Sequence, residues 1–325
     1  MIPPVVSLAD VDAATDRIRG IAVPTPMLRS AWLSDEAGAE VWLKLEAVQP
    51  TGSFKIRGAA HALARLKAAF PDTARVVTAS AGNHGQAVAF AGRHFGIQAR
   101  VYVPSFAAAA KRDSLRKLGA DVIETATYEE AETEAKADAA RTGVRYLSPY
   151  ADPDVVAGAG TVAREMIAEV PQLDAVVAPV GGGGLLAGTA IVARALTPAA
   201  LVIGAEAAAS PAFTAALAAG GPVTVTVMDT LADGLAGNMD PDTFTFGVVR
   251  DLVDRVETTA EAEIASAMRG LIARERLIVE GATACAVAVV LRGGRALKGR
   301  TIGIILSGRN VDADVIGRVL AAGRA

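Results

Sequence analysis

One lysine stands in a setting that favours chemistry over a purely structural role. Lys55 lies in residues 51–58 (TGSFKIRG), in the first turn of a predicted helix and between the apolar residues Phe54 and Ile56. The positive end of the helix dipole disfavours a cation there and lowers the pKa of an amine. A buried, largely neutral amine suits Schiff-base formation with a carbonyl compound. A lysine that extends its charged end to solvent is the alternative.

A run of four glycines separates the apolar segment 174–180 (DAVVAPV) from an apolar helix that we expect to start near Leu185. Glycine loses more conformational freedom on folding than any other residue, so four in a row need a reason. A phosphate on the helix N-terminus supplies one, because backbone without Cβ atoms can surround it. A tight turn from strand to helix is the simpler alternative. The four residues are Gly181, Gly182, Gly183 and Gly184.

The same turn also matches a permissive dinucleotide-binding fingerprint. The match runs through Gly182, Gly184 and Ala187, and Glu206 ends the next predicted strand. An NAD-dependent oxidoreductase is therefore a competing interpretation, although it leaves Lys55 without a role.

Two further loops follow predicted strands. Residues 80–85 (SAGNHG) open a helix, and the N–H groups of such a turn can bind a carboxylate or another anion. An ordinary Asn or Ser helix cap is the alternative. Residues 307–310 (SGRN) end the apolar segment 301–306 (TIGIIL), so Ser307 is either a helix cap or a ligand contact. In open parallel sheets, ligands bind beyond the carboxyl ends of the strands, where these loops fall.

The loops require a scaffold in which strands alternate with helices. Segments rich in Val and Ile alternate with amphipathic segments between residues 75 and 150, and again from residue 174 onward. This pattern predicts an α/β fold with two open, mostly parallel twisted sheets and helices on both faces. We predict a small domain over 75–150 and a discontinuous large domain over 1–74 and 151–325, with the ligand in the cleft between them. Residues 40–47 (EVWLKLEA) alternate apolar and polar residues and predict a strand, and residues 223–227 (VTVTV) are a candidate short strand.

Composition narrows the class of protein. The chain has 325 residues, of which 52% are hydrophobic and 21% charged, so it has ample material for a core and is not disordered. Its net charge of −3 and interspersed charges offer no basic face for nucleic acid. A single cysteine, Cys285, excludes an intrachain disulfide and an all-cysteine metal site. No uncharged apolar stretch reaches the roughly 18 residues of a membrane helix, and the start of the chain lacks a signal-peptide pattern. We expect a cytoplasmic protein with a small-molecule substrate.

Together the motifs resemble the fold type II, tryptophan-synthase-β-like, pyridoxal-phosphate enzymes, in particular the serine/threonine dehydratase and serine racemase branch. The resemblance implies pyridoxal 5′-phosphate as the cofactor and a homodimer as the assembly. It spans nearly the whole chain, and its motifs occur in the expected order: PTPML at 24–28, KLE at 44–46, TGSFKIRGA at 51–59, SAGNHGQA at 80–87, the four glycines and SGRN at 307–310.

By position, the resemblance implies a role for each loop. Lys55 would bond to the cofactor aldehyde, Phe54 would pack beside the ring, and Ser307 would face the pyridine nitrogen. Asn83 would hydrogen-bond the phenolic oxygen. The remaining cofactor contacts implied are Gly181, Gly182, Gly183, Gly184 and the Leu185 backbone at the phosphate, with Gly234 and Glu280 along the cofactor. The substrate carboxylate would bind, largely through backbone N–H groups, to Ser80, Ala81, Gly82, Asn83 and His84.

The implied pyridine partner carries information about the reaction. A serine hydroxyl cannot protonate the ring nitrogen as an aspartate can, so the cofactor is a weaker electron sink. We therefore expect loss of water from a β-hydroxy amino acid such as serine, threonine or 3-hydroxyaspartate, giving a 2-oxo acid and ammonia, with Lys55 as general base. Racemases of this branch have a second acid/base serine where this chain has Ala81, so we expect little racemisation. A racemase and a non-catalytic cofactor-binding protein are the alternatives.

Three residues leave their roles open. Glu206 matches a divalent-cation ligand of relatives, but Ser210 and Ala212 follow it and a second carboxylate is absent, so a cation is left undecided. Arg309 either points to solvent or contacts a carboxylate on the substrate side chain. Tyr150 either shapes the substrate side-chain site or fills the seam between the domains.

Overall fold

The structure, a computed structural model, describes residues 5–293 and 297–322, and its strands form two sheets. The first four residues, which entered the signal-peptide argument, lie outside this range. All paired strands are parallel except the first two, which are antiparallel. The larger sheet has six strands, in the spatial order β1 (Met27–Ser30), β2 (Glu40–Lys44), β9 (Thr301–Ile305), β6 (Ala175–Pro179), β7 (Leu201–Ala207) and β8 (Arg255–Thr259).

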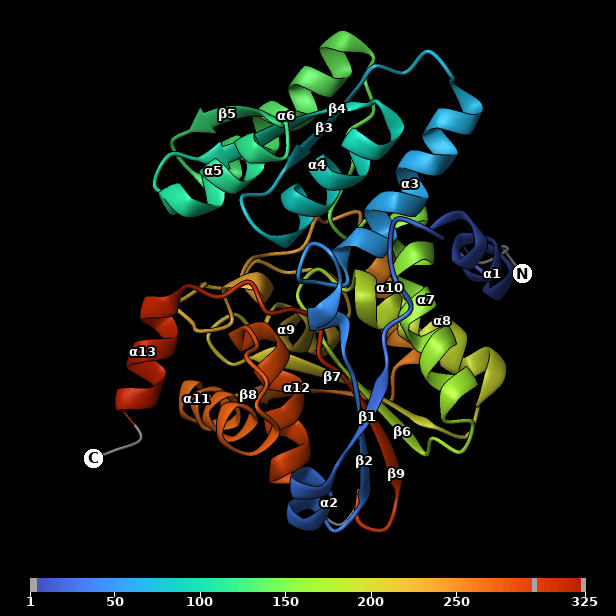
Figure 1. Cartoon of the computed structure of the whole chain (residues 1–325), viewed down its shortest axis with the longest axis vertical. Helices are drawn as coiled ribbons and strands as arrows, with labels where there is room; N and C mark the ends of the chain where they lie inside the picture. The colour runs from blue at the N-terminus through green and yellow to red at the C-terminus, as the bar shows by residue number, and fades with distance from the viewer. Residues whose placement is uncertain (1–4, 294–296, 323–325) are drawn as a thin grey trace.

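The smaller sheet has the order β3 (Arg75–Ala79), β4 (Gln98–Pro104) and β5 (Asp121–Thr125). Helices α4 (Asn83–Phe95), α5 (Ala109–Lys117) and α6 (Tyr128–Thr142) connect and cover its strands. Figure 1 shows this unit at one end of the long axis and the larger sheet at the other. The predicted fold, α/β with two open and mostly parallel sheets, is confirmed.

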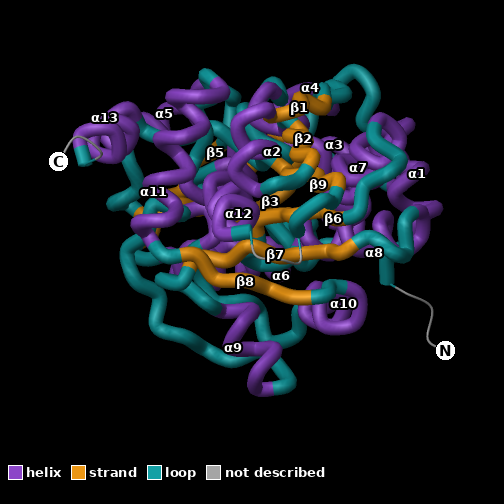
Figure 2. Tube along the Cα trace, turned by 90° about the horizontal axis from the view of Figure 1, so that it is seen from below, coloured by secondary structure: helices purple, strands orange, loops and turns teal. Residues whose placement is uncertain are grey.

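Helices cover both faces of the larger sheet, and each face has its own apolar core. In Figure 2 the two sets of helices lie on opposite sides of the strands. One core contains residues of α1 (Leu8–Arg17), α7 (Pro153–Glu169), α8 (Gly184–Leu196), α9 (Ala212–Ala219) and α10 (Phe244–Leu252). The other contains residues of α2 (Ala31–Ala37), α11 (Glu261–Gly270), α12 (Gly281–Arg292) and α13 (Ala313–Ala321), and Cys285 is buried within it.

Helix α3 (Lys55–Ala69) joins the two units. Its apolar side chains, including Ile56 and Leu63, share one core with α4, β3 and β4. The helix also packs against α7 of the larger unit. The smaller sheet lies within residues 75–150, whereas its core extends beyond them into α3. The domain limits stay a prediction.

Two segments differ from the sequence-based expectation. Residues 223–227 form no strand, because the side chain of Asn238 satisfies the backbone of Val225 at both its N–H and its carbonyl. The alternating segment that begins at Glu40 leaves the extended conformation after Lys44 and continues as the short helix η1 (Glu46–Val48). In the ranges that the structure describes, no helix combines the length and apolar character needed to cross a membrane.

Candidate active site

The segment that precedes α3 pairs with the loop that follows β9. The Phe54 N–H donates to the Ser307 carbonyl at 2.9 Å, and the Arg309 N–H donates to the Gly52 carbonyl at 2.9 Å. Gly52 has a φ of +73°, and a Cβ there would come within 2.5 Å of Asn310 Oδ1. A glycine is therefore required for this close pairing. The pairing brings the start of α3, and with it Lys55, beside Ser307.

Lys55 is the first residue of α3, and its amine lies in a confined environment. Its Nζ donates to the Pro149 carbonyl at 2.7 Å and lies 5.1 Å from the centroid of the Phe54 ring. Burial lowers the pKa of the Lys55 amine to about 8, and the nearby carboxylate of Glu280 opposes this shift. About a tenth of the amine is therefore neutral at pH 7, far more than for an unperturbed lysine.

Ser307 is buried, and its hydroxyl lies 2.9 Å from the hydroxyl of Thr283. Thr283 also donates to the Gly308 carbonyl at 3.0 Å and accepts from the Gly308 N–H at 2.9 Å. Three contacts fix the rotamer of Thr283 and, through it, the position of Ser307. Thr283 was not predicted from the sequence, where its only signal is a hydroxyl in the otherwise apolar stretch 282–290.

The four glycines form the turn between β6 and α8. Gly183 has a φ of +88° and precedes α8, whose N-terminus has no side-chain cap. The ring of Tyr150 covers this turn, since a Cβ on Gly182 would come within 2.2 Å of its Cγ. Leu185 is buried in the apolar core, so it can offer only backbone to a ligand in the turn. The result is a close-packed turn with N–H groups at a helix N-terminus, which suits a phosphate.

Substitution of Gly182 tests the packing of this turn. We expect Gly182→Ala to weaken the binding of pyridoxal phosphate by about tenfold or more, because its Cβ would force the Tyr150 ring away from the turn. Fluorescence titration of the apoprotein with the cofactor measures the change. Gly221→Ala is the matched control, since a Cβ at Gly221 meets nothing within 4 Å. Equal affinity for all three proteins would contradict this prediction.

The loop after β3 leads into α4, whose N-terminus also has no side-chain cap. The Ser80 hydroxyl accepts the Gly82 N–H at 3.3 Å. His84 Nε2 lies 3.1 Å from the Leu147 carbonyl, and burial, aided by the charge of Lys55, lowers the pKa of the imidazole to about 3. Ala81 is buried in the core of the smaller unit. This turn therefore offers backbone N–H groups to an anion, and its imidazole is uncharged near neutral pH.

Comparisons with known proteins agree with this geometry. The family model described as "Pyridoxal-phosphate dependent enzyme" matches residues 18–308. The L-threonine ammonia-lyase of Thermotoga maritima is 38% identical over 98% of this chain and 79% of the relative. The L-threo-3-hydroxyaspartate ammonia-lyase of Saccharomyces cerevisiae is 37% identical over 93% of each chain. The structure of maize serine racemase superimposes with a TM-score of 0.91 at 31% identity, covering 98% of each chain.

The chain belongs to the pyridoxal-phosphate-dependent enzyme family. Its cofactor is pyridoxal 5′-phosphate, and three features of the site fit that molecule. The uncapped N-terminus of α8 suits the phosphate, the depressed pKa of Lys55 suits reaction with the aldehyde, and the buried Ser307 hydroxyl suits a polar ring atom. The dinucleotide interpretation is thereby excluded.

In this chain Glu206 caps a helix and does not serve as a cation ligand. Its carboxylate is buried and accepts from the N–H groups of Phe213 and Thr214, at 2.6 and 3.0 Å, and from the Thr214 hydroxyl at 2.7 Å. It therefore caps the N-terminus of α9. Ser210 and Ala212 offer no further carboxylate, so these residues do not fit a divalent cation. In residues 5–293 and 297–322, no three His, Cys, Asp or Glu side chains cluster as metal ligands would.

Three other predicted residues lie around the site of this pyridoxal-phosphate enzyme. The Tyr150 hydroxyl accepts the Asp240 N–H at 3.0 Å, which holds the ring over the glycine turn. Gly234 lies in the short helix η2 (Asp233–Leu235), where a Cβ would make ordinary contact with Ala282 at 3.5 Å. Arg309 is exposed, and its backbone alone joins the pairing with Gly52. A substrate contact by Arg309 stays a prediction.

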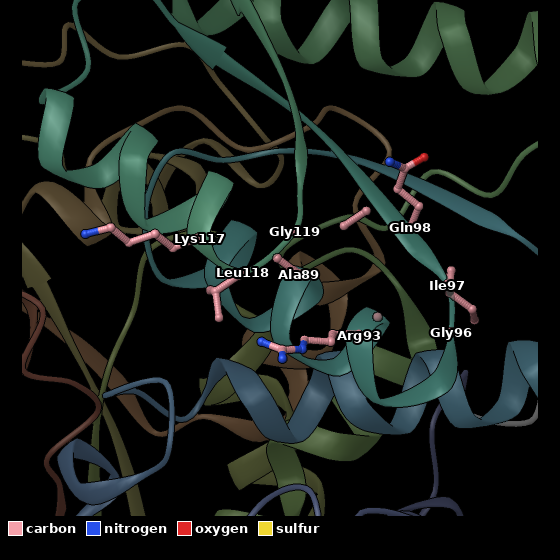
Figure 3. A pocket seen from close by; sticks show the side chains of 10 residues that line it. Ala89, Arg93, Gly96, Ile97, Gln98, Lys117, Leu118 and Gly119 are labelled. Atoms are coloured by element: carbon pink, nitrogen blue, oxygen red, sulfur yellow. The ribbon is translucent and has the colours of Figure 1, made fainter.

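The described part of the enzyme has two notable cavities, and one of them reaches the site. This cavity, of about 440 Å³, extends from Glu280 and Asn310 to Lys111 and Asp233. The other, of about 480 Å³, lies at the opposite end of the smaller sheet, where α4 and α5 end and β4 begins (Figure 3). The carboxyl ends of the strands face away from that second cavity, which therefore lies apart from the site. The first cavity borders the site through Glu280, but its lining includes neither Lys55 nor the glycine turn.

Proposed function

We propose that the enzyme is an ammonia-lyase that removes water from a β-hydroxy amino acid and yields a 2-oxo acid and ammonia. The observation that carries the proposal is the distribution of proton carriers. The Lys55 amine has a pKa lowered to about 8. The loop after β3 has the inert methyl of Ala81, the uncharged imidazole of His84 and a Ser80 hydroxyl that accepts the Gly82 N–H. Elimination needs one base at Cα, whereas racemisation needs proton carriers on both faces.

The backbone and side chains of the site would act as follows. The uncapped N-terminus of α4 binds the substrate carboxylate, and the glycine turn before α8 binds the cofactor phosphate. When bound, pyridoxal phosphate withdraws electrons from the substrate Cα. Lys55 Nζ removes the Cα proton, and the return of a proton to the β-hydroxyl lets that group leave as water. Hydrolysis of the resulting enamine gives the 2-oxo acid and ammonia. Ser307, held by Thr283, keeps the ring nitrogen from gaining a full positive charge.

The relatives divide between ammonia-lyases and racemases, and the ammonia-lyases among them suggest substrates. Two of those described above carry the names of ammonia-lyases for threonine and for 3-hydroxyaspartate. The expected homodimer stays a prediction, which analytical ultracentrifugation of the holoenzyme would measure.

A substrate screen with chiral analysis tests the proposal. With L-serine, L-threonine and L-threo-3-hydroxyaspartate, we expect release of 2-oxo acid and ammonia in equal amounts from at least one substrate, and a racemisation rate at least about a hundredfold lower. Liquid chromatography of the remaining amino acid measures its D and L forms. Rapid interconversion without 2-oxo acid, or no reaction of any substrate by the holoenzyme, would overturn the assignment.

Arg309→Gly is the matched variant for substrate choice. If the Arg309 guanidinium binds the second carboxylate of hydroxyaspartate, we expect this variant to have a lower kcat/KM for hydroxyaspartate alone.

A further inference from the structure

Glu280 lies directly beneath the loop that follows β9. The residue is buried, and both of its carboxylate oxygens accept from Asn83 Nδ2, at 3.0 and 2.9 Å. A Cβ on Gly308 would come within 2.6 Å of Glu280 Oε1, so only a glycine there leaves room for the carboxylate. The Glu280 N–H also donates to the Gly308 carbonyl at 3.1 Å. Glu280 is therefore tied to the same loop that carries Ser307.

The amide of Asn83 is held from both ends. Asn310 Nδ2 donates to Asn83 Oδ1 at 2.6 Å and to the Thr51 carbonyl at 2.9 Å. An ionised carboxylate can only accept, so Glu280 selects the nitrogen end of the Asn83 amide. That nitrogen has two hydrogens, and the carboxylate leaves one of them for another acceptor. Residues from three other segments thus determine which way this single amide points.

Several charges face Glu280 from the surrounding elements. Burial raises the pKa of the Glu280 carboxyl to about 7, and Asp233 adds to the shift, while Asn83, Lys111 and Lys55 oppose it. In turn, the Glu280 anion raises the proton affinity of Lys55. The other ionisable groups that line the same cavity are Asp229, Glu261, Asp312 and Arg318.

We propose that Glu280 is a positioning residue of the cofactor site, which directs the Asn83 N–H toward the cofactor and whose own proton governs the charge beside Lys55. Loss of that proton adds a negative charge that raises the proton affinity of Lys55, and it leaves a carboxylate that can only accept from Asn83. Gain of the proton removes the charge and gives the carboxyl a donor as well, so that it no longer selects the nitrogen end of Asn83. The inference rests on the cofactor and on the Asn83 contact with it, not on any choice of substrate.

A pH titration of the substrate-free holoenzyme tests the proposal. We expect the visible band of the bound cofactor to shift with a midpoint near pH 7 in the wild type and to lose that step in Glu280→Gln. Asp312→Asn is the matched control, because it removes the same charge from the same cavity while Asp312 is exposed and makes no contact with Asn83. The control is expected to retain the step. In addition, Glu280→Ala is expected to weaken cofactor binding by about tenfold.

Three results would overturn the proposal: no step near pH 7 in the wild type, an unchanged step in Glu280→Gln, or loss of the step in Asp312→Asn. Since these spectra need no substrate, their outcome is independent of the proposed ammonia-lyase activity. If Glu280→Gln fails to fold, carbon-13 NMR of glutamate-labelled wild-type holoenzyme provides a second measurement. One carboxyl resonance with a midpoint near pH 7 supports the proposal, and its absence overturns it.

Discussion

Lys55→Ala is expected to abolish both the visible absorbance of the covalently attached cofactor and turnover, lowering kcat by about four orders of magnitude or more. The structure gives the reason. Lys55 Nζ lies between the Pro149 carbonyl and the Phe54 ring, beside the loop that carries Ser307, and its pKa of about 8 leaves part of the amine neutral. An alanine removes both the group that bonds to the cofactor and the base at Cα. Absorbance spectra and 2-oxo acid release measure the two losses separately.

Two further variants make this experiment specific. Lys67 lies in the last turn of the same helix, where its amine binds the Thr73 carbonyl, so Lys67→Ala should retain both signals. Lys55→Arg keeps the positive charge but is expected to lose both, because a guanidinium stays protonated and forms no Schiff base. Borohydride reduction followed by peptide mapping locates the attached cofactor. Attachment at any other lysine, or a fully active Lys55→Ala, would contradict the assignment.

The loops of the site were predictable because their signals are local. A lysine in the first turn of a helix, four consecutive glycines and polar residues after apolar strands each define their own surroundings. The rule that ligands bind at the carboxyl ends of parallel strands then predicts their convergence. The structure does bring the segment before α3 into contact with the loop after β9.

The partners of these residues could not be predicted in the same way. Asn83 and Glu280 are 197 positions apart, and Thr283 lies 24 positions before Ser307. Neither pairing has a periodic or compositional signal, because each depends on how separate elements pack. Glu206 shows the same limit, since its role as a cap depends on the loop that directs α9 toward it. Local patterns predict elements, whereas long-range packing decides which polar groups meet.

The motifs PTPML and KLE have a physical explanation that the sequence did not provide. Thr25 and Lys44 belong to them, and both bind carboxylates of a buried ionic cluster, which we define as Arg57, Glu46, Glu165 and Lys44. Arg57 binds Glu46 at 2.7 and 2.8 Å and Glu165 at the same two distances. The cluster has no net charge, and it joins β2, η1, α3 and α7. Arg57, the member of the cluster in α3, lies two residues after Lys55, so the cluster anchors the start of this helix.

Arg57→Met is expected to lower the free energy of unfolding by about 3–5 kcal/mol, because removal of one partner leaves buried carboxylates without their counter-ion. The side chains of Arg57 and Glu46 are 1% and 0% exposed, so water cannot replace the lost contacts. Urea denaturation of the apoprotein measures the change.

Arg65→Ala is the control: its side chain is 50% exposed and pairs with Asp154, so we expect a loss of at most about 1 kcal/mol. The double variant Arg57→Met/Glu46→Gln should recover part of the stability by removing one of the stranded charges. Equal losses in Arg57→Met and Arg65→Ala would show that the ionic cluster does not hold α3 in place. The position of Lys55 would then have to depend on the pairing of Gly52 and Phe54 with the loop after β9.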